Sequence, residues 1–116
     1  MESHEKRQNK RIPCEIESSF KNLADPAVTP LSQTTLNDIS EGGVRFRSNH
    51  FVSVHHKLLF KINIPNHKTI EVLAQPSWIR EIPSLNQYDI GAKFISLSDT
   101  DRDIIRKFMG GPSAQI

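Results

Sequence analysis

The chain has 116 residues, of which 36% are hydrophobic and 24% are charged, a composition typical of one soluble globular domain. Its formal net charge of +2 is too small to indicate a nucleic-acid-binding domain by itself. The only cysteine, Cys14, has no partner for an internal disulfide, and no apolar segment follows the polar N-terminus as a signal peptide would require. We therefore expect a cytoplasmic protein with no membrane insertion.

The positive charge is concentrated at the start of the chain. Residues 1–11 contain four basic and two acidic side chains, which accounts for the whole net charge. We interpret these residues as a flexible basic arm that carries Arg7 and Arg11 and can meet an anion. The body of the domain is then expected over residues 12–110, followed by a tail over residues 111–116.

An alternation of apolar and polar residues dominates the chain after this arm and predicts about six short antiparallel strands. The expected strands cover residues 14–20, 33–38, 44–47, 58–64, 70–79 and 88–94. Residues 21–31 contain the proline, asparagine and aspartate typical of a loop, and residues 40–43 form a tight turn. Pro76 interrupts the fifth strand, which indicates a bulge or an edge strand. We interpret the neighbouring Trp78 as a core residue in preference to one that lines a barrel mouth.

The pattern becomes helical near the end of the chain. Ser98 followed three residues later by Asp101 resembles a capping box, and Arg106 and Lys107 suit the negative end of the helix dipole. A glycine pair at 110–111, followed by proline, ends the helix. Many short strands with one terminal helix favour a small barrel or sandwich.

Motifs for enzyme chemistry are missing from the sequence. It contains neither a G-x-G-x-x-G nor a P-loop lysine motif, and its five histidines lack metal-ligand spacing. Cys14 lies on the apolar face of its strand, where we interpret it as a buried structural thiol. We therefore expect a protein without enzyme activity, metal or cofactor.

Two short clusters remain, and each alone is commonplace. The first is Arg7 and Arg11, four residues apart on the polar arm; the second is Asp38, Ser40 and Gly43 at the end of a strand. Together they suit a guanine nucleotide. An arginine fork matches both the O6/N7 edge of guanine and a phosphate, and a carboxylate accepts from the N1–H and N2–H₂ donors. A serine hydroxyl beside the backbone N–H groups of a glycine turn suits a phosphate oxygen, and glycine permits a positive φ or a close backbone approach.

In order and spacing the two clusters resemble the signature of the PilZ domain, the bacterial receptor domain for cyclic dimeric GMP. Arg7 and Arg11 match R-x-x-x-R, and Asp38, Ser40 and Gly43 match [D/N]-x-S-x-x-G. Residues 88–94, of the form Y-x-x-G-x-x-F, are similar to the last strand of that family, and the terminal helix is similar to its C-terminal helix. The resemblance extends from residue 7 to residue 109.

This resemblance implies a mainly β fold, a six-stranded antiparallel PilZ-type split barrel with one C-terminal α-helix. It implies that Arg7, Arg11, Asp38, Ser40 and Gly43 bind cyclic dimeric GMP, with the arm folded over the barrel mouth. It also implies a possible role for Lys6, because a basic residue there is associated in the family with two stacked ligand molecules. A solvated lysine is the alternative that the sequence leaves open.

We therefore expect a stand-alone adaptor that changes conformation on binding the second messenger and regulates an unidentified partner protein, because the chain leaves no room for an output domain. The alternative is a degenerate PilZ protein–protein interaction module that does not bind nucleotide, which the intact motifs argue against. A nucleic-acid-binding barrel is disfavoured by the neutral body of the domain and an aromatic content of only 7%. No motif supports a flavin-dependent split-barrel enzyme.

Overall fold

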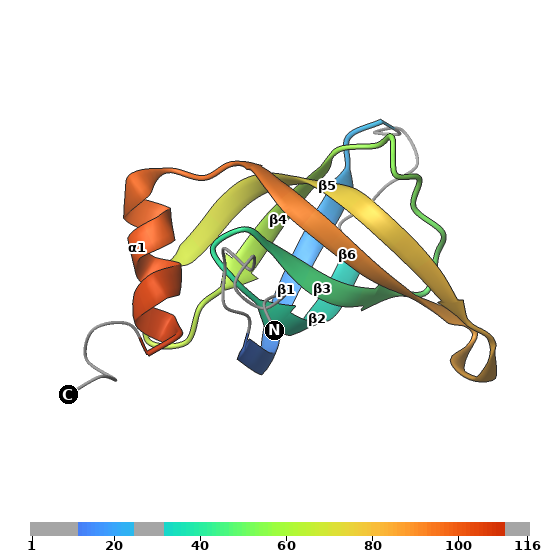
Figure 1. The fold of residues 1–116 in the computed structure, drawn as a ribbon, viewed down its shortest axis with the longest axis horizontal. Helices are drawn as coiled ribbons and strands as arrows, with labels where there is room; N and C mark the ends of the chain where they lie inside the picture. The colour runs from blue at the N-terminus through green and yellow to red at the C-terminus, as the bar shows by residue number, and fades with distance from the viewer. Residues whose placement is uncertain (1–11, 25–31, 111–116) are drawn as a thin grey trace, which may run out of the picture.

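A computed structural model describes residues 12–24 and 32–110, which form a closed antiparallel barrel of six strands with one α-helix (Figure 1). The strands are β1 (Ile12–Asn22), β2 (Ser32–Ile39), β3 (Gly43–Ser48), β4 (Leu58–Asn63), β5 (Thr69–Ile82) and β6 (Gln87–Ser96). Their order around the barrel is β1-β2-β3-β6-β5-β4, and pairing of β1 with β4 closes it. A single 3₁₀ turn, η2 (Pro83–Leu85), joins β5 to β6. The predicted fold class is confirmed.

The barrel interior is filled by the apolar residues of the alternating pattern. In β4, for example, Leu58, Phe60 and Ile62 are buried, whereas the side chains between them face outward. Phe20, Phe46 and Phe60 come from three strands and meet at the centre, with ring centroids 5.0–5.4 Å apart. Tilted and edge-on contacts at these distances are favourable for aromatic rings. The core therefore fixes the positions of β1, β3 and β4 relative to one another.

The helix α1 (Asp99–Phe108) covers one end of the barrel (Figure 1). Ser98 caps its N-terminus by accepting a hydrogen bond from the Asp101 backbone N–H at 3.0 Å, as the sequence predicts. Ile105 is fully buried in the core, and Ile104 and Phe108 pack beside it. Within the described ranges, no helix has the length and apolar character needed to cross a membrane.

Five of the six strands are longer than the alternating pattern predicts, and β1 and β5 extend the furthest. Lys21 and Asn22, which the sequence places in a loop, continue β1 and pair with β4. The strand β5 continues to Ile82, and its register with β6 shifts between Pro76 and Trp78. This shift confirms the predicted bulge. The edge alternative is wrong, because β5 pairs with β4 on one side and with β6 on the other.

Candidate functional site

The predicted turn joins β2 to β3 and is built around a buried hydroxyl. The Ser40 Oγ accepts hydrogen bonds from the backbone N–H groups of Gly42 at 3.0 Å and Gly43 at 3.2 Å. The Ser40 N–H donates to the Gly43 carbonyl at 2.9 Å, and the Ser40 side chain is fully buried. This is the local hydrogen bonding by which serine stabilises turns. Ser40 thus shapes the turn that carries the predicted ligand-binding residues.

Gly43 is required by its close approach to β6. A Cβ atom at this position would lie 2.1 Å from the Ala92 carbonyl oxygen, which no side chain can accommodate without movement of the backbone. Of the two explanations that the sequence leaves open for this glycine, close approach therefore applies. A positive φ does not, since Gly110 is the only glycine of the described residues that has one. Gly42 adds a second link, because its carbonyl accepts from the Phe94 N–H at 2.9 Å.

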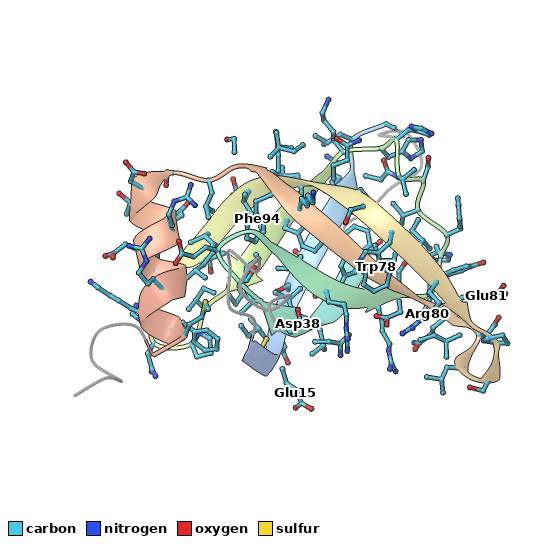
Figure 2. All side chains as sticks on the ribbon, in the orientation of Figure 1. Glu15, Asp38, Trp78, Arg80, Glu81 and Phe94 are labelled. Carbon is cyan, nitrogen blue, oxygen red and sulfur yellow. The ribbon has the colours of Figure 1, made fainter. Side chains whose placement is uncertain are left out.

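A pocket of about 480 Å³ opens between this turn and the bulge of β5, within the usual size range for small-molecule sites. It is lined by Asp38, Gly42, Gly43, Arg45, Ser77, Trp78, Gly91, Ala92 and Lys93. Figure 2 shows Asp38 and Trp78 on the same face of the barrel. The structure therefore brings Asp38 and Gly43 together at one pocket, with Ser40 in the turn beneath.

Trp78 forms one wall of the pocket, so its interpretation as a core residue is wrong. The side chain is 42% exposed and lies against Gly91, where a Cβ atom would come within 2.2 Å of the indole nitrogen. The reason is the bulge. Ile70, Val72, Ala74 and Pro76 are buried at every second position, and the extra residue after Pro76 moves Trp78 to the outer face.

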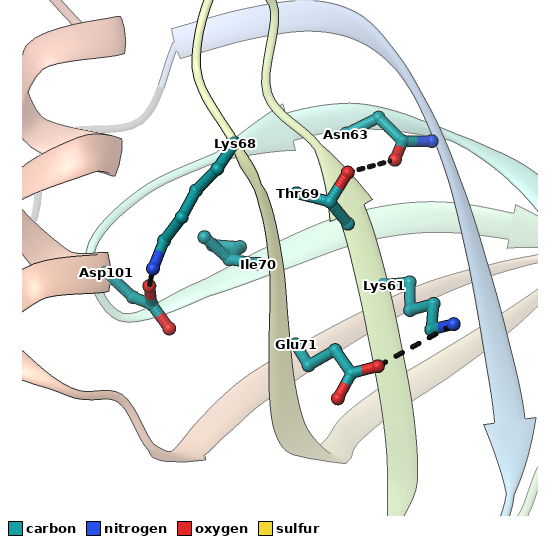
Figure 3. A pocket seen from close by; sticks show the side chains of 7 residues that line it. All are labelled: Lys61, Asn63, Lys68, Thr69, Ile70, Glu71 and Asp101. Atoms are coloured by element: carbon teal, nitrogen blue, oxygen red, sulfur yellow. Dashed lines mark hydrogen bonds and ion pairs between the residues drawn. The ribbon is translucent and has the colours of Figure 1, made fainter.

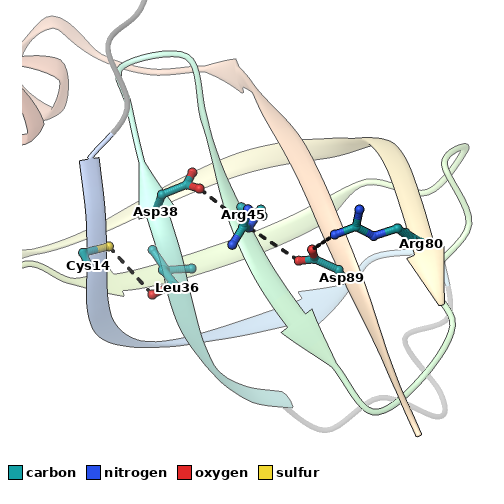
Figure 4. A network of polar contacts seen from close by, with 6 residues as sticks. All are labelled: Cys14, Leu36, Asp38, Arg45, Arg80 and Asp89. Carbon is teal, nitrogen blue, oxygen red and sulfur yellow. Dashed lines mark hydrogen bonds and ion pairs between the residues drawn. The ribbon is translucent and has the colours of Figure 1, made fainter. Parts of the chain in front are cut away.

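A row of four charged side chains crosses the barrel surface beside the pocket (Figure 4). The Arg45 Nε lies 3.6 Å from an Asp38 carboxylate oxygen and 3.6 Å from an Asp89 carboxylate oxygen. Asp89 in turn accepts a hydrogen bond from the Arg80 guanidinium at 2.9 Å. Asp89 is only 3% exposed although it belongs to the outward-facing set of β6. The sequence motifs do not include Arg45, Arg80 or Asp89, because strand register alone makes them neighbours.

Cys14 lies next to this row on β1 and is half-buried, where the sequence predicts full burial. Its Sγ donates to the Leu36 carbonyl at 3.7 Å. Burial, reinforced by the negative charge of Asp38, raises the pKa of the thiol to about 11. A thiol that is harder to ionise is a poor nucleophile, so the geometry agrees with a structural role.

The turn is also joined to α1. The Arg106 guanidinium donates to both carboxylate oxygens of Glu41, at 2.9 Å each, and Glu41 stands between Ser40 and Gly42. This two-point contact lowers the pKa of Glu41. The contact spans 65 positions of sequence and connects the end of the barrel to the rim of the pocket.

A larger cavity of about 650 Å³ lies on the hairpin of β4 and β5 near α1 (Figure 3). Its lysines are already matched by acids: Lys61 lies 3.7 Å from Glu71, and Lys68 lies 3.6 Å from Asp101. None of the predicted site residues that the structure describes lines it. The smaller pocket beside Asp38 is therefore the better candidate. Arg7, Arg11 and Lys6 lie outside the described residues.

Comparison with known proteins agrees with this fold. The sequence matches the PilZ domain family over residues 5–111. Among solved structures it is similar to the inhibitor of motility MotI (DgrA) of Bacillus subtilis, with a TM-score of 0.75 and 16% identity over 90% of this chain and 50% of that one. It is also similar to the PilZ domain of Escherichia coli YcgR with c-di-GMP, with a TM-score of 0.69 and 17% identity over 94% and 92%.

A third solved structure is the PlzA protein of Borreliella burgdorferi in complex with c-di-GMP, with a TM-score of 0.59 and 11% identity over 96% of this chain and 54% of that one. The chain thus spans about half the length of MotI and PlzA. No curated protein matches the sequence. At these identities the solved structures establish the shared fold.

Proposed function

The chain belongs to the PilZ domain family, and we propose on this basis that it is a receptor for cyclic dimeric GMP that acts as an adaptor without enzyme activity. The observation that carries the proposal is the pocket in which Asp38 and the Gly42–Gly43 turn meet the partly exposed side chain of Trp78. A recessed carboxylate, an aromatic side chain and a glycine turn are groups that suit a guanine nucleotide.

The strand register supports a role for Arg7 and Arg11 in ligand binding. Ile12 pairs with Ile39 and Pro13 pairs with Asp38, so β1 begins directly beside the turn. Arg11 precedes Ile12 in the chain, and Arg7 is five residues from it, a span of at most roughly 18 Å when fully extended. Both arginines are therefore tethered within reach of the pocket.

Each group has a chemical role in the proposed complex. Asp38 accepts from the N1–H and N2–H₂ donors of guanine, and the exposed part of the Trp78 side chain contacts the base. Arg7 and Arg11 bind the phosphates or the O6/N7 edge through their planar forks. Lys93, exposed on the pocket wall, adds positive charge near the phosphates. The bound protein then presents an altered surface to a partner protein.

Isothermal titration of the full chain with cyclic dimeric GMP tests this proposal. We expect the wild type to bind and Arg11→Ala to bind at least ~30-fold more weakly, because the loss of one partner from a close ionic contact costs ~2–5 kcal/mol. Arg11→Lys is expected not to restore binding, because an ammonium lacks the fork.

Parallel titrations with GTP and single-stranded DNA separate the alternatives. A wild type that binds neither cyclic dimeric GMP nor DNA would favour the degenerate interaction module. Preferential binding of DNA would favour the nucleic-acid-binding barrel. An Arg11→Ala variant that binds cyclic dimeric GMP within about threefold of the wild type would remove Arg11 from the site.

A further inference from the structure

We infer that Arg45 is a specificity-determining residue of the proposed site, a third arginine that donates to the O6 atom of the guanine held by Asp38, and that Asp89 is the residue that positions it. This inference rests on the proposed function, since it assigns the recognition of the base within that pocket. Arg45 lies outside both sequence motifs and on a different strand from Asp38.

The position of Arg45 places its guanidinium at the edge of the pocket. Arg45 pairs with Asp38 across β2 and β3 and with Gly91 across β3 and β6. It lines the same pocket as Asp38 and Trp78. The Nε is buried, whereas the side chain as a whole is 39% exposed. The buried Nε can therefore contact other protein groups, while the exposed part of the Arg45 side chain can contact a ligand.

Arg45 and Asp89 form an ion pair that is too long for a hydrogen bond. Among the described residues, the Arg45 Nε and the Asp89 Oδ1 are both buried atoms without a hydrogen-bond partner, and they lie 3.6 Å apart. An N–H donor and a carboxylate oxygen reach hydrogen-bond distance at about 2.9 Å. A small movement of the guanidinium would therefore complete this bond, and a ligand that holds the other side of Arg45 can supply that movement.

The burial of Asp89 needs an explanation beyond stability. A carboxylate that is 97% removed from solvent pays a large desolvation cost, which only well-placed cations repay. Asp89 has two, Arg80 at 2.9 Å and Arg45 at 3.6 Å. Such ion pairs contribute little net stability compared with apolar residues, but they fix the orientation of the charged groups that they hold. Asp89 is thus suited to aim Arg45 at the pocket.

The Watson–Crick edge of guanine presents one acceptor, O6, beside two donors, N1–H and N2–H₂. A carboxylate can satisfy the two donors, and a guanidinium beside it can satisfy the acceptor. Asp38 and Arg45 form this pair of groups, with 3.6 Å between a carboxylate oxygen and the Nε. Adenine presents an N6–H₂ donor where guanine has O6. Arg45 would then face a donor and Asp38 would face the N1 lone pair, so both groups reject adenine.

Arg47 provides a matched control. It is the next outward-facing arginine on β3, carries the same charge and is exposed, but it lines a different pocket, with Thr34 and Gln87. Substitution of Arg47 removes the same positive charge from the same strand and leaves the Asp38 pocket intact. A general electrostatic effect would therefore appear equally in Arg45 and Arg47 variants, whereas recognition of O6 would appear only in Arg45 variants.

The test is a titration of the full-length wild type, Arg45→Met, Arg45→Lys and Arg47→Met with cyclic dimeric GMP and with cyclic dimeric AMP, after a thermal melt of each. We expect the wild type to prefer the guanine ligand by ~100-fold or more, the scale of a site whose polar groups are left unpaired by the wrong base. Arg45→Met is expected to bind the guanine ligand at least ~10-fold more weakly and the adenine ligand no more weakly than the wild type does, so that the preference for guanine narrows at least ~10-fold. Arg47→Met is expected to keep the wild-type preference.

The positioning role of Asp89 is measured by a double-mutant cycle. Asp89→Asn is expected to weaken binding of the guanine ligand in the wild type but to have no further effect in the Arg45→Met background, because its effect acts through Arg45. Equal losses in both backgrounds would overturn the positioning role. The double variant also removes the Asp89 carboxylate together with one of its two cations, which avoids a buried carboxylate held by Arg80 alone if Arg45→Met fails to fold.

The outcomes separate this inference from the proposed function. If the wild type binds neither dinucleotide, the proposed function fails and this inference fails with it. If the wild type binds cyclic dimeric GMP and both Arg45 variants keep the affinity and base preference of Arg47→Met, only this inference is overturned.

Discussion

At the scale of single residues, Cys14 gives a prediction that depends on its surroundings alone. Its raised pKa, about 11, leaves roughly 100-fold less thiolate at a given pH than an ordinary cysteine has. We therefore expect iodoacetamide to alkylate the folded protein at pH ~8 at least that much more slowly than the unfolded chain. Mass spectrometry of samples taken over time in buffer and in guanidinium chloride measures the ratio. Similar rates in the two solutions would contradict the structural role.

The same pKa shift has a consequence for stability. Because the pKa is raised on folding, the favourable contribution of the neutral thiol is fully present below the unfolded pKa near 9 and is lost as the pH rises towards 11. The unfolded chain ionises first in this window. The free energy of unfolding should therefore fall between these two pH values more in the wild type than in Cys14→Ser.

Individual residues also show what the sequence could predict of the site. Asp38, Ser40 and Gly43 lie within six consecutive positions, so their proximity follows from the chain itself. The partnership of Trp78 with Gly91, and of Arg45 with Asp89, depends on the register of β3, β6 and β5. A bulge of one residue reverses which side chains face outward. Pro76 predicts a bulge in this part of β5, but no local pattern shows that the extra residue falls before Trp78. For this reason the sequence alone predicts Trp78 in the core, whereas the structure exposes it.

At the scale of elements, the contact between Glu41 and Arg106 connects the pocket turn to α1. Arg106→Gln removes both hydrogen bonds to Glu41 while leaving the Ser98 cap and the buried Ile105 in place. We expect faster amide hydrogen exchange in α1 at neutral pH, because the helix loses one of its connections to the barrel. Lys107→Gln is the control, since Lys107 pairs with Asp103 on the same helix. Equal effects of the two substitutions would show that the contact between Glu41 and Arg106 does not hold α1 to the barrel.

The pH dependence of this contact has a definite sign. Arg106 lowers the pKa of Glu41, so the contribution of the pair is present above the ordinary carboxyl pKa and is lost as the pH falls through the lowered value. The difference in exchange between the wild type and Arg106→Gln should persist above the ordinary carboxyl pKa of 4.5 and disappear as the pH falls through the lowered pKa of Glu41.

The sequence predicts the strands and the helix more reliably than the residues at which they end. The strand β4 and the helix α1 follow from a single clear period and a capping serine, and both are confirmed. The extension of β1 through Lys21 and Asn22 has no local signal, because their strand conformation comes from pairing with Leu59 and Leu58. Pairing over such sequence distances is decided by the closure of the barrel.

At the scale of the whole molecule, we propose that the N-terminal arm and the barrel act together as a ligand-dependent switch. The predicted arm lies outside the described residues, but its chemistry is clear from the sequence. Apart from Met1, it contains no apolar residue before Ile12, and Arg7, Lys10 and Arg11 repel one another. The barrel offers Asp38, 15% exposed, directly beside the start of β1. A ligand with two phosphates would supply the negative charge that draws the arginines to this mouth.

We therefore expect the amides of residues 2–11 to exchange rapidly in the free protein and to become protected when cyclic dimeric GMP binds. Hydrogen exchange with mass spectrometry, with and without ligand, measures this change. Asp38→Ala at the same ligand concentration is the control, because it keeps the arm and loses the carboxylate that holds the base. Strong protection of residues 7–11 in the free protein, unchanged by ligand, would mean that the arm is already docked. The ligand would then replace an internal Arg–Asp contact, and a partner protein would have no change at the mouth to recognise.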